Sequence, residues 1–249
     1  MTNAGEQKVA VVTGGGRGIG AAIAQRLASD GFAVAVNYSR SETHAADVVA
    51  KIVAGGGRAV AIKADIGNAA SAEELISRTA DTLGAPSVLV NNAGMNLAGS
   101  VRKQEPEDWD RVISVNLSGA FYCTHAALPA MYENGWGRVV FFGSPSGGRR
   151  PSPGMSAYSA AKAGLTGMTR TLALEVARRG ITVNTVVPGF VETDIISSGG
   201  DAAVDALAAH WPRIPAESVA ATVSFLVSDD ARHVSGEEVG VWLGGPVGV

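Results

Sequence analysis

Short runs of apolar, mostly β-branched residues alternate along this chain with longer, alanine-rich segments of helical periodicity. The short runs predict strands at Val9–Val12, Ala33–Tyr38, Ala59–Lys63, Val88–Asn91, Arg138–Phe142, Thr182–Val186 and Glu238–Val241. The longer segments predict helices near 18–30, 41–54, 70–83, 107–133, 156–179 and 215–228. Nearly continuous apolar strands that alternate with helices indicate a parallel sheet covered on both faces. Right-handed crossovers then give a doubly wound α/β sheet of about seven strands.

The chain has no polar linker that would divide it. Its 249 residues suit one α/β domain that spans 1–249. Residues 190–214 contain Gly199-Gly200 and a short helical pattern, which is typical of a mobile lid over a substrate cleft. An apolar cover for the substrate would come from Ile195, Ile196, Leu207 and Trp211, unless these side chains form local core.

Two of the predicted helices, 107–133 and 156–179, are poor in charge through most of their length. A helix that is apolar all round is buried on more than one side. One side would cover the sheet, and the other is expected to contact a second subunit, which predicts a homo-oligomer. The composition, 46% hydrophobic and 17% charged, fits apolar surface that is covered by partner subunits.

A net charge of −3 gives no overall basic field to attract nucleic acid or an anionic membrane. The polar start, MTNAGEQK, lacks the apolar region of a signal peptide. The longest uncharged run, Val112 to Tyr132, contains Asn116, so a buried helix is expected rather than a membrane span. These features predict a cytoplasmic protein. The single cysteine, Cys123, is expected to be a buried apolar residue, and the scattered histidines suggest no metal site.

A glycine-rich loop joins the first predicted strand to the first predicted helix, within VAVVTGGGRGIGAAIAQRLASDG at 9–31. Glycines let a backbone approach a pyrophosphate closely, and the helix N-terminus offers free N–H groups and the positive end of its dipole. Between a strand and a helix such a loop indicates the dinucleotide site of a Rossmann fold. The residues expected at the cofactor are Gly14, Gly16, Arg17, Gly18, Ile19 and Gly20.

The second predicted strand ends in Asn37 and Tyr38, and Ser39 and Arg40 follow it. An NAD site usually has an Asp or Glu here, which binds the ribose diol of the adenosine. This chain has no carboxylate there to repel a 2′-phosphate, and Arg17 and Arg40 could both pair with one. The sequence therefore favours NADP(H) over NAD, unless both arginines are merely solvated.

Two further strand ends are expected at the cofactor. Asp65, followed by Ile66, comes after the third strand, where it could accept a hydrogen bond from the adenine amino group or cap the helix near residue 70. The fourth strand ends in small and amide residues, Asn91, Asn92, Ala93 and Gly94. Such residues line the ligand crevice at the carboxyl ends of strands in open α/β sheets.

The motifs TGGGRGIG, NNAG, YSAAK and PGFVET occur in this order between Val9 and Gly245. This ordered set resembles the short-chain dehydrogenase/reductase family, in its single-domain branch, and most of all the ketoreductases of the 3-oxoacyl-carrier-protein type. The resemblance implies that Tyr158 is the catalytic acid/base, that Lys162 is its partner, and that Asn116 holds a proton-relay water. It also implies a nicotinamide-side loop with Pro188, Gly189, Val191 and Thr193.

The spacing of Tyr158 and Lys162 suits acid/base chemistry, since residues four apart lie on one helix face. A nearby ammonium is expected to lower the pKa of the phenol from its ordinary value of about 10. The phenol could then protonate a carbonyl oxygen as hydride arrives, or deprotonate an alcohol in the reverse reaction. Lys162 is also expected to bind the ribose hydroxyls beside the nicotinamide.

Two serines compete for the catalytic hydroxyl that the family places near this tyrosine. Counting back from Tyr158 by the family's usual spacing reaches Pro145, which has no hydroxyl. Counting along the preceding strand reaches Ser144, so we favour Ser144 over Ser146 and infer a one-residue insertion in the loop. Ser152 lies in mid-loop, and Ser156 is interpreted as the cap of the helix that carries Tyr158.

The substrate is less sharply defined than the cofactor. Met95, Asn96, Leu97 and Met155 could line a pocket for an uncharged or partly apolar carbonyl compound. Reductases of carrier-bound acyl chains generally have basic residues near the end of the long helix, but this chain has Tyr132-Glu133-Asn134-Gly135-Trp136 there, and only Arg179 matches a second basic position. Half of the patch expected for an acidic carrier protein is therefore missing.

Three functions are compatible with these residues. The favoured one is NADPH-dependent reduction of a ketone or a 3-oxoacyl group to a secondary alcohol. An NAD-dependent alcohol or sugar dehydrogenase is the first alternative, and Asn37 and Arg17 argue against it. A non-catalytic dinucleotide sensor is the second, and the presence of Asn116, Tyr158 and Lys162 argues against that.

Overall fold

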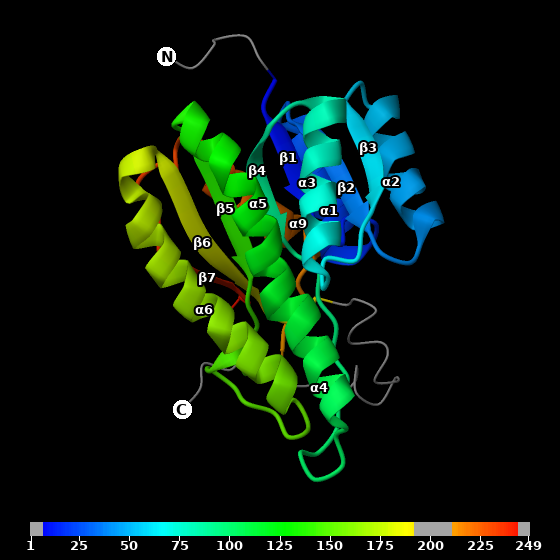
Figure 1. Cartoon of the computed structure of the whole chain (residues 1–249), viewed down its shortest axis with the longest axis vertical. Helices are drawn as coiled ribbons and strands as arrows, with labels where there is room; N and C mark the ends of the chain where they lie inside the picture. The colour runs from blue at the N-terminus through cyan, green and yellow to red at the C-terminus, as the bar shows by residue number, and fades with distance from the viewer. Residues whose placement is uncertain (1–6, 192–210, 244–249) are drawn as a thin grey trace.

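The computed structural model describes residues 7–191 and 211–243 (Figure 1). Its centre is a seven-stranded parallel sheet in the order β3-β2-β1-β4-β5-β6-β7. The strands are β1 (Val9–Val12), β2 (Ala33–Tyr38), β3 (Ala59–Lys63), β4 (Pro86–Asn91), β5 (Gly137–Phe142), β6 (Ile181–Pro188) and β7 (Glu238–Val241). The chain builds outward from β1 to β3, returns to β4 beside β1, and then builds outward in the other direction. The predicted doubly wound sheet is therefore confirmed.

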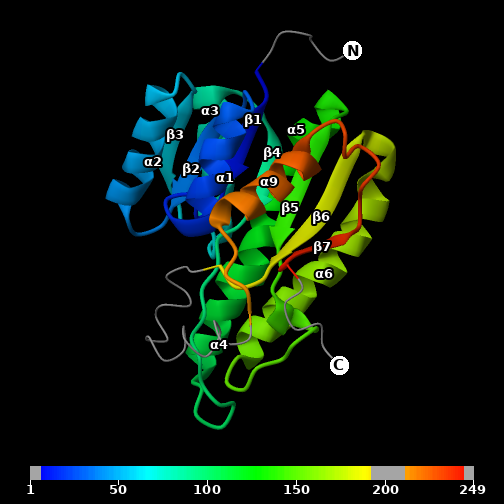
Figure 2. The same ribbon diagram turned by 180° about the vertical axis from the view of Figure 1, so that it is seen from behind.

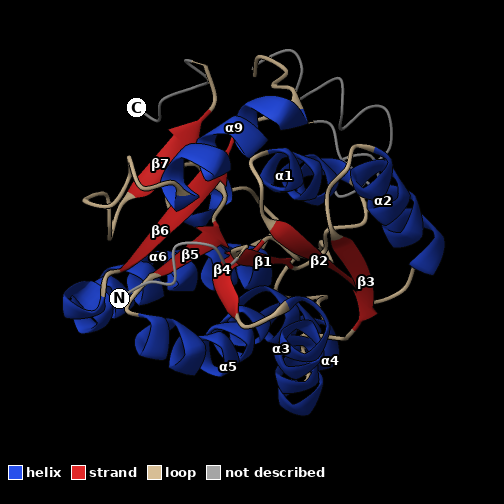
Figure 3. Ribbon diagram, turned by 90° about the horizontal axis from the view of Figure 1, so that it is seen from above, coloured by secondary structure: helices blue, strands red, loops and turns tan. Residues whose placement is uncertain are grey.

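Helices cover both faces of this sheet, as Figure 3 shows from above. One layer contains α1 (Gly18–Ser29), α2 (Glu42–Ala54) and α9 (Ala216–Val227), and Figure 2 shows α1 and α9 in front of the sheet. The other layer contains α3 (Ala69–Leu83), α4 (Pro106–Ile113), α5 (Gly119–Asn134) and α6 (Ser156–Val176). No helix in the described ranges is long and apolar enough to cross a membrane.

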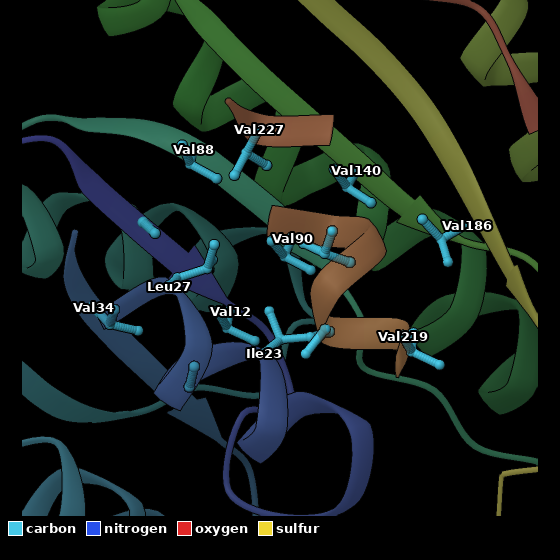
Figure 4. Close-up of a cluster of buried hydrophobic side chains, with 14 of the residues drawn as sticks. Val12, Ile23, Leu27, Val34, Val88, Val90, Val140, Val186, Val219 and Val227 are labelled. Carbon is cyan, nitrogen blue, oxygen red and sulfur yellow. The ribbon is translucent and has the colours of Figure 1, made fainter. Parts of the chain in front are cut away.

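Each face of the sheet has its own hydrophobic core because neighbouring strand residues point to opposite faces. Val88 and Val90 of β4 pack toward α1 and α9, in the cluster that Figure 4 shows, whereas Leu89 packs toward the other layer. Burial on both faces explains why the strands are continuously apolar. Cys123 of α5 is fully buried in the second core, and burial raises the pKa of its thiol to about 12, so it is an inert core residue as expected.

The helix predicted over 107–133 is not uniform. It consists of α4, a π-helical turn η1 (Ser114–Ser118), and α5. A π-turn widens the helix by one residue and changes the direction of the side chains that it carries. Hydrophobic periodicity does not predict this turn, which contains Asn116.

Candidate active site

A cavity of about 820 Å³ opens at the carboxyl ends of the strands. Its lining comes from the segments that follow β1, β2, β3, β4, β5 and β6. The strand order reverses between β1 and β4, and the crevice at such a reversal is where open α/β sheets bind their ligands. In Figure 1 this end of the sheet points downward, toward the loops that precede α4 and α6.

The glycine-rich loop forms one wall of the cavity and is held by amide side chains. Asn92 Nδ2 donates to the carbonyl oxygens of Thr13 (2.9 Å) and Gly14 (3.2 Å). Gly14 has a φ of +62°, and a Cβ at Gly20 would overlap the carbonyl oxygen of Gly14 and lie 2.6 Å from Asn92 Nδ2. These two positions therefore require glycine, and the backbone they leave exposed is the cradle that a pyrophosphate needs.

The same wall includes the N-terminus of α1. The helix starts after Arg17, whose side chain makes no capping hydrogen bond, and Gly18 and Ile19 line the cavity. The N–H groups of a first helical turn have no partner within the helix. Here they face the cavity with the positive end of the helix dipole, which fits the phosphates of a dinucleotide.

The end of β2 forms the next part of the wall, with Tyr38, Ser39 and Arg40 on the cavity together with Asn37. The side chain of Asn37 is already used within the protein. Its Oδ1 accepts from Gly14 N (3.2 Å), and its Nδ2 donates to the carbonyl oxygens of Ile62 (3.3 Å) and Ala64 (3.1 Å). Asn37 therefore braces the glycine-rich loop, and the groups available to a cofactor phosphate come from other residues.

Two cations that the sequence places at the cofactor, Arg17 and Arg40, line the cavity. Ser41 and His44, which the sequence did not single out, lie on the same wall. Arginine forms bidentate hydrogen bonds with phosphate. The wall therefore fits a 2′-phosphate on the adenosine ribose and lacks the carboxylate that would bind a free ribose diol.

Asp65 lies on the cavity beside Ile66, but it does not cap α3. Asn68 caps that helix, with its side chain accepting from Ser71 N. The carboxylate of Asp65 instead accepts from Gly67 N (3.1 Å) and from Arg111 Nη2 (2.9 Å). The capping alternative was therefore wrong. Nothing in the sequence indicates the pairing with Arg111, because the two residues are 46 positions apart.

Tyr158 and Lys162 meet at the carboxyl end of β5, both on the wall of the cavity. Lys162 Nζ donates to the carbonyl oxygen of Phe142 (2.7 Å) and lies 5.5 Å from the centre of the Tyr158 ring. Burial lowers the pKa of Lys162 to about 8. Burial also raises the pKa of Tyr158 above 10, and a hydrogen bond with Ser144 opposes that rise.

The sequence-based expectation that Lys162 lowers the pKa of the phenol was therefore wrong for this structure. Removing both groups from water disfavours their charged forms, and this effect outweighs the attraction of a phenolate to an ammonium. At neutral pH Tyr158 keeps its proton, which is the form that can donate to a carbonyl oxygen. The geometry thus suits an acid in the direction of reduction.

The serine beside this tyrosine is Ser144, which precedes a short 3₁₀ turn, η2 (Pro145–Gly147). Proline fits the first position of a helical turn because its φ is fixed and its missing N–H has no role there. The hydroxyl of Ser144 accepts from Ser146 N (3.3 Å) and hydrogen-bonds with Tyr158. The turn therefore accommodates Pro145 and brings the hydroxyl of Ser144 to the phenol, although Ser146 also lines the cavity.

Asn116 is almost fully buried beneath Gly94 and Met95, which line the cavity. Its Nδ2 donates to the carbonyl oxygens of Met95 (2.7 Å) and Val112 (2.9 Å). A Cβ at Gly94 would lie 2.8 Å from Asn116 Oδ1 and 3.5 Å from Lys162 Nζ. Asn116 therefore fixes the loop after β4. It also lies close to Lys162, because Gly94 has no side chain to separate the two.

The interpretation of Ser156 as a helix cap was wrong. Met155 is the N-cap residue of α6, and Ser156 is the first residue of the helix, so it cannot bond its own first turn as a cap does. Its Oγ donates instead to Gln104 Oε1 (3.3 Å), and Gly99 N donates to the carbonyl oxygen of Gly154 (2.9 Å). These contacts join the loops before α4 and α6 into one wall.

The remaining wall is partly as predicted. Met95, Met155, Ala93, Pro188, Gly189 and Val191 line the cavity, as does Trp211, whereas Asn96 and Leu97 do not. Thr193 and the lid residues Ile195, Ile196 and Leu207 lie outside the described residues, so the lid over 190–214 stays a prediction. Other lining residues that the sequence did not assign to the pocket include Val115, Arg150, Ser152 and Phe190. Ser152 and Arg150 belong to the loop before α6, where composition alone does not tell which side chains face the cavity.

Known proteins match this chain over most of its length. Residues 8–202 match a family model described as short chain dehydrogenase. A 3-oxoacyl-[acyl-carrier-protein] reductase of Synechocystis sp. is 41% identical over 235 residues, 94% of this chain and 95% of the relative. The BbsD subunit of (2S)-[(R)-hydroxy(phenyl)methyl]succinyl-CoA dehydrogenase of Thauera aromatica is 40% identical over 93% of this chain and 94% of the relative. The crystal structure of a short chain dehydrogenase of Burkholderia cenocepacia in complex with NADP superposes with a TM-score of 0.88, at 40% identity over 95% of this chain and 96% of the other.

Proposed function

Because the chain belongs to the short-chain dehydrogenase family, we propose that it reduces a ketone or a 3-oxoacyl group to a secondary alcohol with NADPH. The observation that carries this proposal is the convergence of Ser144, Tyr158 and Lys162 on the cavity that the glycine-rich loop also lines. A phosphate cradle and a protonated phenol in one cavity fit hydride transfer coupled to proton transfer.

NADPH, when bound, supplies the hydride to the carbonyl carbon. Tyr158 donates its proton to the carbonyl oxygen, and its raised pKa keeps that proton in place until the oxygen becomes basic. When the substrate is bound, the hydroxyl of Ser144 turns from Tyr158 to donate to the same oxygen and orients it. Lys162 is held by the carbonyl of Phe142 beside the phenol, where it would bind the ribose hydroxyls and stabilise negative charge on the tyrosine oxygen. Asn116 fixes the backbone between Gly94 and Met95 against Lys162.

The cofactor preference rests on the wall after β1 and β2. Arg17 and Arg40 lie on the cavity there, and the side chain of Asn37 is engaged with Gly14 and the end of β3. The related structure from Burkholderia cenocepacia contains NADP. NADPH is therefore the cofactor that both the lining residues and the likeness support.

The substrate is proposed as a free or thioester-linked carbonyl compound and not as a chain on a carrier protein alone. The relative from Synechocystis sp. is named for an acyl-carrier-protein substrate, whereas the relative from Thauera aromatica is named for a coenzyme A thioester. In this chain Arg179 lies over the ring of Tyr132, 5.1 Å from its centre. Both residues lie near the ends of α6 and α5, at the end of the strands opposite the cavity, and Tyr132 supplies no charge for an acidic carrier.

A homo-oligomer is part of the same proposal. Phe121 of α5 is 50% exposed and Leu174 of α6 is 82% exposed, on the two helices that are poor in charge. Large apolar side chains exposed on neighbouring helices are typical of a protein contact. Light scattering of the purified protein tests this part, since a monomer at micromolar concentration would contradict it.

Two measurements test the proposed function. Titration with NADPH and NADH, followed by quenching of tryptophan fluorescence, should show tighter binding of NADPH. Replacing Arg17 and Arg40 together with Ala should weaken NADPH binding about 100-fold or more and change NADH binding little, because each arginine contributes a charge-assisted hydrogen bond of roughly 1.5–3 kcal/mol. Arg58→Ala, directly before β3 and so at the end of the strands opposite the cavity, is the matched control. Tight NADH binding without a response to NADPH would contradict the cofactor assignment.

Turnover is the second measurement. The absorbance of NADPH should fall when ketones and 3-oxoacyl thioesters are added, and an alcohol should appear in equal amount. Oxidation of alcohols or sugars with NAD alone would support the dehydrogenase alternative. Binding of NADPH without turnover on any carbonyl compound would support the sensor.

A further inference from the structure

We propose that Arg150 selects carbonyl substrates that carry a carboxylate, by pairing its guanidinium with that group at the substrate side of the cavity. Arg150 is exposed to solvent, lines the cavity, and lies over the ring of Trp211, 5.8 Å from the ring centre. This inference rests on the proposed ketone reduction. It also replaces the sequence-based expectation of an uncharged substrate, because the sequence alone does not place the arginines of this loop.

The neighbouring arginine explains why Arg150 faces the cavity. Arg149 Nε donates to Glu238 Oε1 (2.8 Å), and its guanidinium lies over the ring of Trp242, 4.9 Å from the ring centre. The other oxygen of Glu238 accepts from Thr166 on α6 (2.8 Å). Arg149 is thereby held against β7 and α6 and is not on the cavity wall.

The backbone of the loop is fixed at the same place. The carbonyl oxygen of Pro145 accepts from the N–H groups of both Arg149 (3.0 Å) and Arg150 (2.7 Å). The anchored side chain of Arg149 and this double hydrogen bond leave the next side chain, Arg150, on the cavity. A short, anchored connection to Ser144 fixes the position of Arg150 relative to the catalytic hydroxyl, as a specificity residue requires.

In the described ranges, the other charged residues that line the cavity do not pair with Arg150, so its guanidinium is available to the substrate. Asp65 is the one carboxylate among the described lining residues, and it pairs with Arg111. Arg17 and Arg40 follow β1 and β2, whereas Arg150 follows β5, which is separated from β2 by β1 and β4. Three strand spacings are about 14 Å, so Arg150 is not expected to reach the 2′-phosphate that Arg17 and Arg40 would bind. No carboxylate of the described residues pairs with Arg150.

The surroundings of Arg150 define the class of substrate. Trp211 and Met155 line the same cavity and offer apolar and aromatic surface. A guanidinium beside such a surface suits a compound with an apolar body and a carboxylate, because Arg forms two parallel hydrogen bonds with a carboxylate. The structure therefore points to oxo acids in which the carboxylate lies apart from the ketone.

The test compares substrates that differ only in this charge. Oxo acids of increasing length, from 3-oxo to 6-oxo carboxylates, are assayed with NADPH beside their methyl esters. The wild-type enzyme should prefer the acid over its ester about tenfold in kcat/KM at one or more lengths, since a charge-assisted hydrogen bond to a bound carboxylate is worth about one order of magnitude. Arg150→Gln should remove this preference by raising KM for the acid about tenfold, with kcat and the ester rates changed less than twofold.

Two further variants complete the test. Arg150→Lys keeps the charge without the bidentate geometry and should retain part of the preference. Arg58→Gln removes an exposed charge directly before β3, at the end of the strands opposite the cavity, and should behave as the wild type. Increasing salt should raise KM for the acid in the wild type and not in Arg150→Gln, because screening weakens exposed pairs.

Several outcomes would overturn the inference. Equal rates for acids and esters at every length, or an equal loss of both in Arg150→Gln, would show that Arg150 does not bind the carboxylate. Arg150→Gln could instead lower kcat/KM only for 3-oxoacyl-coenzyme A and leave the N-acetylcysteamine thioester and the acids unchanged. That result would show that Arg150 binds a phosphate of coenzyme A and not a carboxylate. An enzyme that reduces neither acids, esters nor thioesters with NADPH would refute the proposed function itself and this inference with it.

Discussion

The choice between Ser144 and Ser146 can be decided by two alanine variants. Ser144→Ala removes a hydroxyl that hydrogen-bonds with Tyr158 and accepts from Ser146 N at 3.3 Å. Removing one donor from a developing alkoxide costs about 100-fold or more in kcat, or roughly 3 kcal/mol. We therefore expect Ser144→Ala to lose about 100-fold in kcat with NADPH, and Ser146→Ala to lose less than threefold.

The fold should be little affected, since Ser144 caps a turn of only three residues. Loss of this cap is expected to lower the free energy of unfolding by about 1 kcal/mol or less, which a thermal melt of each variant will measure. The pH profile gives a second readout. Because the hydrogen bond with Ser144 lowers the pKa of Tyr158, its removal should move the alkaline fall of the reduction rate to higher pH. The assignment would be wrong if Ser146→Ala were slow and Ser144→Ala retained both the rate and the pH profile of the wild type.

Three further predictions concern the same cavity. Tyr158→Phe should bind NADPH as the wild type does and lose about 1,000-fold in kcat, because no other group replaces the proton of the phenol. Fluorescence titration measures the binding and initial rates measure kcat. Retained turnover would contradict the mechanism. Lys162→Met should be up to about 3 kcal/mol more stable than the wild type at pH 7, since the folded protein holds this lysine at a pKa of about 8 and the unfolded chain near 10.5. The unfolded chain binds more protons between these values, so the difference in denaturation midpoints should shrink from pH 8 to 10.5; a constant difference would refute the burial cost. Gly20→Ala should weaken NADPH binding at least tenfold and lower the melting temperature, because the added methyl overlaps Gly14 and Asn92. A variant that binds NADPH as the wild type does would contradict this prediction and show that the loop adapts.

Much of the fold follows from local patterns in the sequence. The apolar runs located all seven strands, and β1, β2, β3 and β7 have the predicted bounds. β4 begins at Pro86 and β6 extends to Pro188. Because proline is unfavourable inside a strand, a proline in the sequence suggests that the strand has ended, although both strands continue to it. The glycine-rich loop was equally local, because positive φ and close backbone contacts at Gly14 and Gly20 demand glycine at those positions.

The long helix was predicted less well for a physical reason. A π-turn at Ser114–Ser118 adds one residue to a helical turn without changing hydrophobic composition, so periodicity cannot reveal it. The tertiary structure stabilises it through the two hydrogen bonds from Asn116 Nδ2 and the close approach of Gly94. The role of Asn116 was inferred from the family resemblance, whereas its contacts became known only from the structure.

By itself, then, the sequence determined the doubly wound sheet, the phosphate loop and the pairing of a tyrosine with a lysine one turn later, since each depends on residues close together in the chain. Only the tertiary structure decided the direction of the pKa shifts of Tyr158 and Lys162, because burial depends on every element packed around them. It likewise decided that Asp65 meets Arg111, that Arg149 is anchored by Glu238, and that Arg150 is left on the cavity. These contacts join residues tens of positions apart, and neither composition nor spacing specifies which of two adjacent arginines faces the substrate.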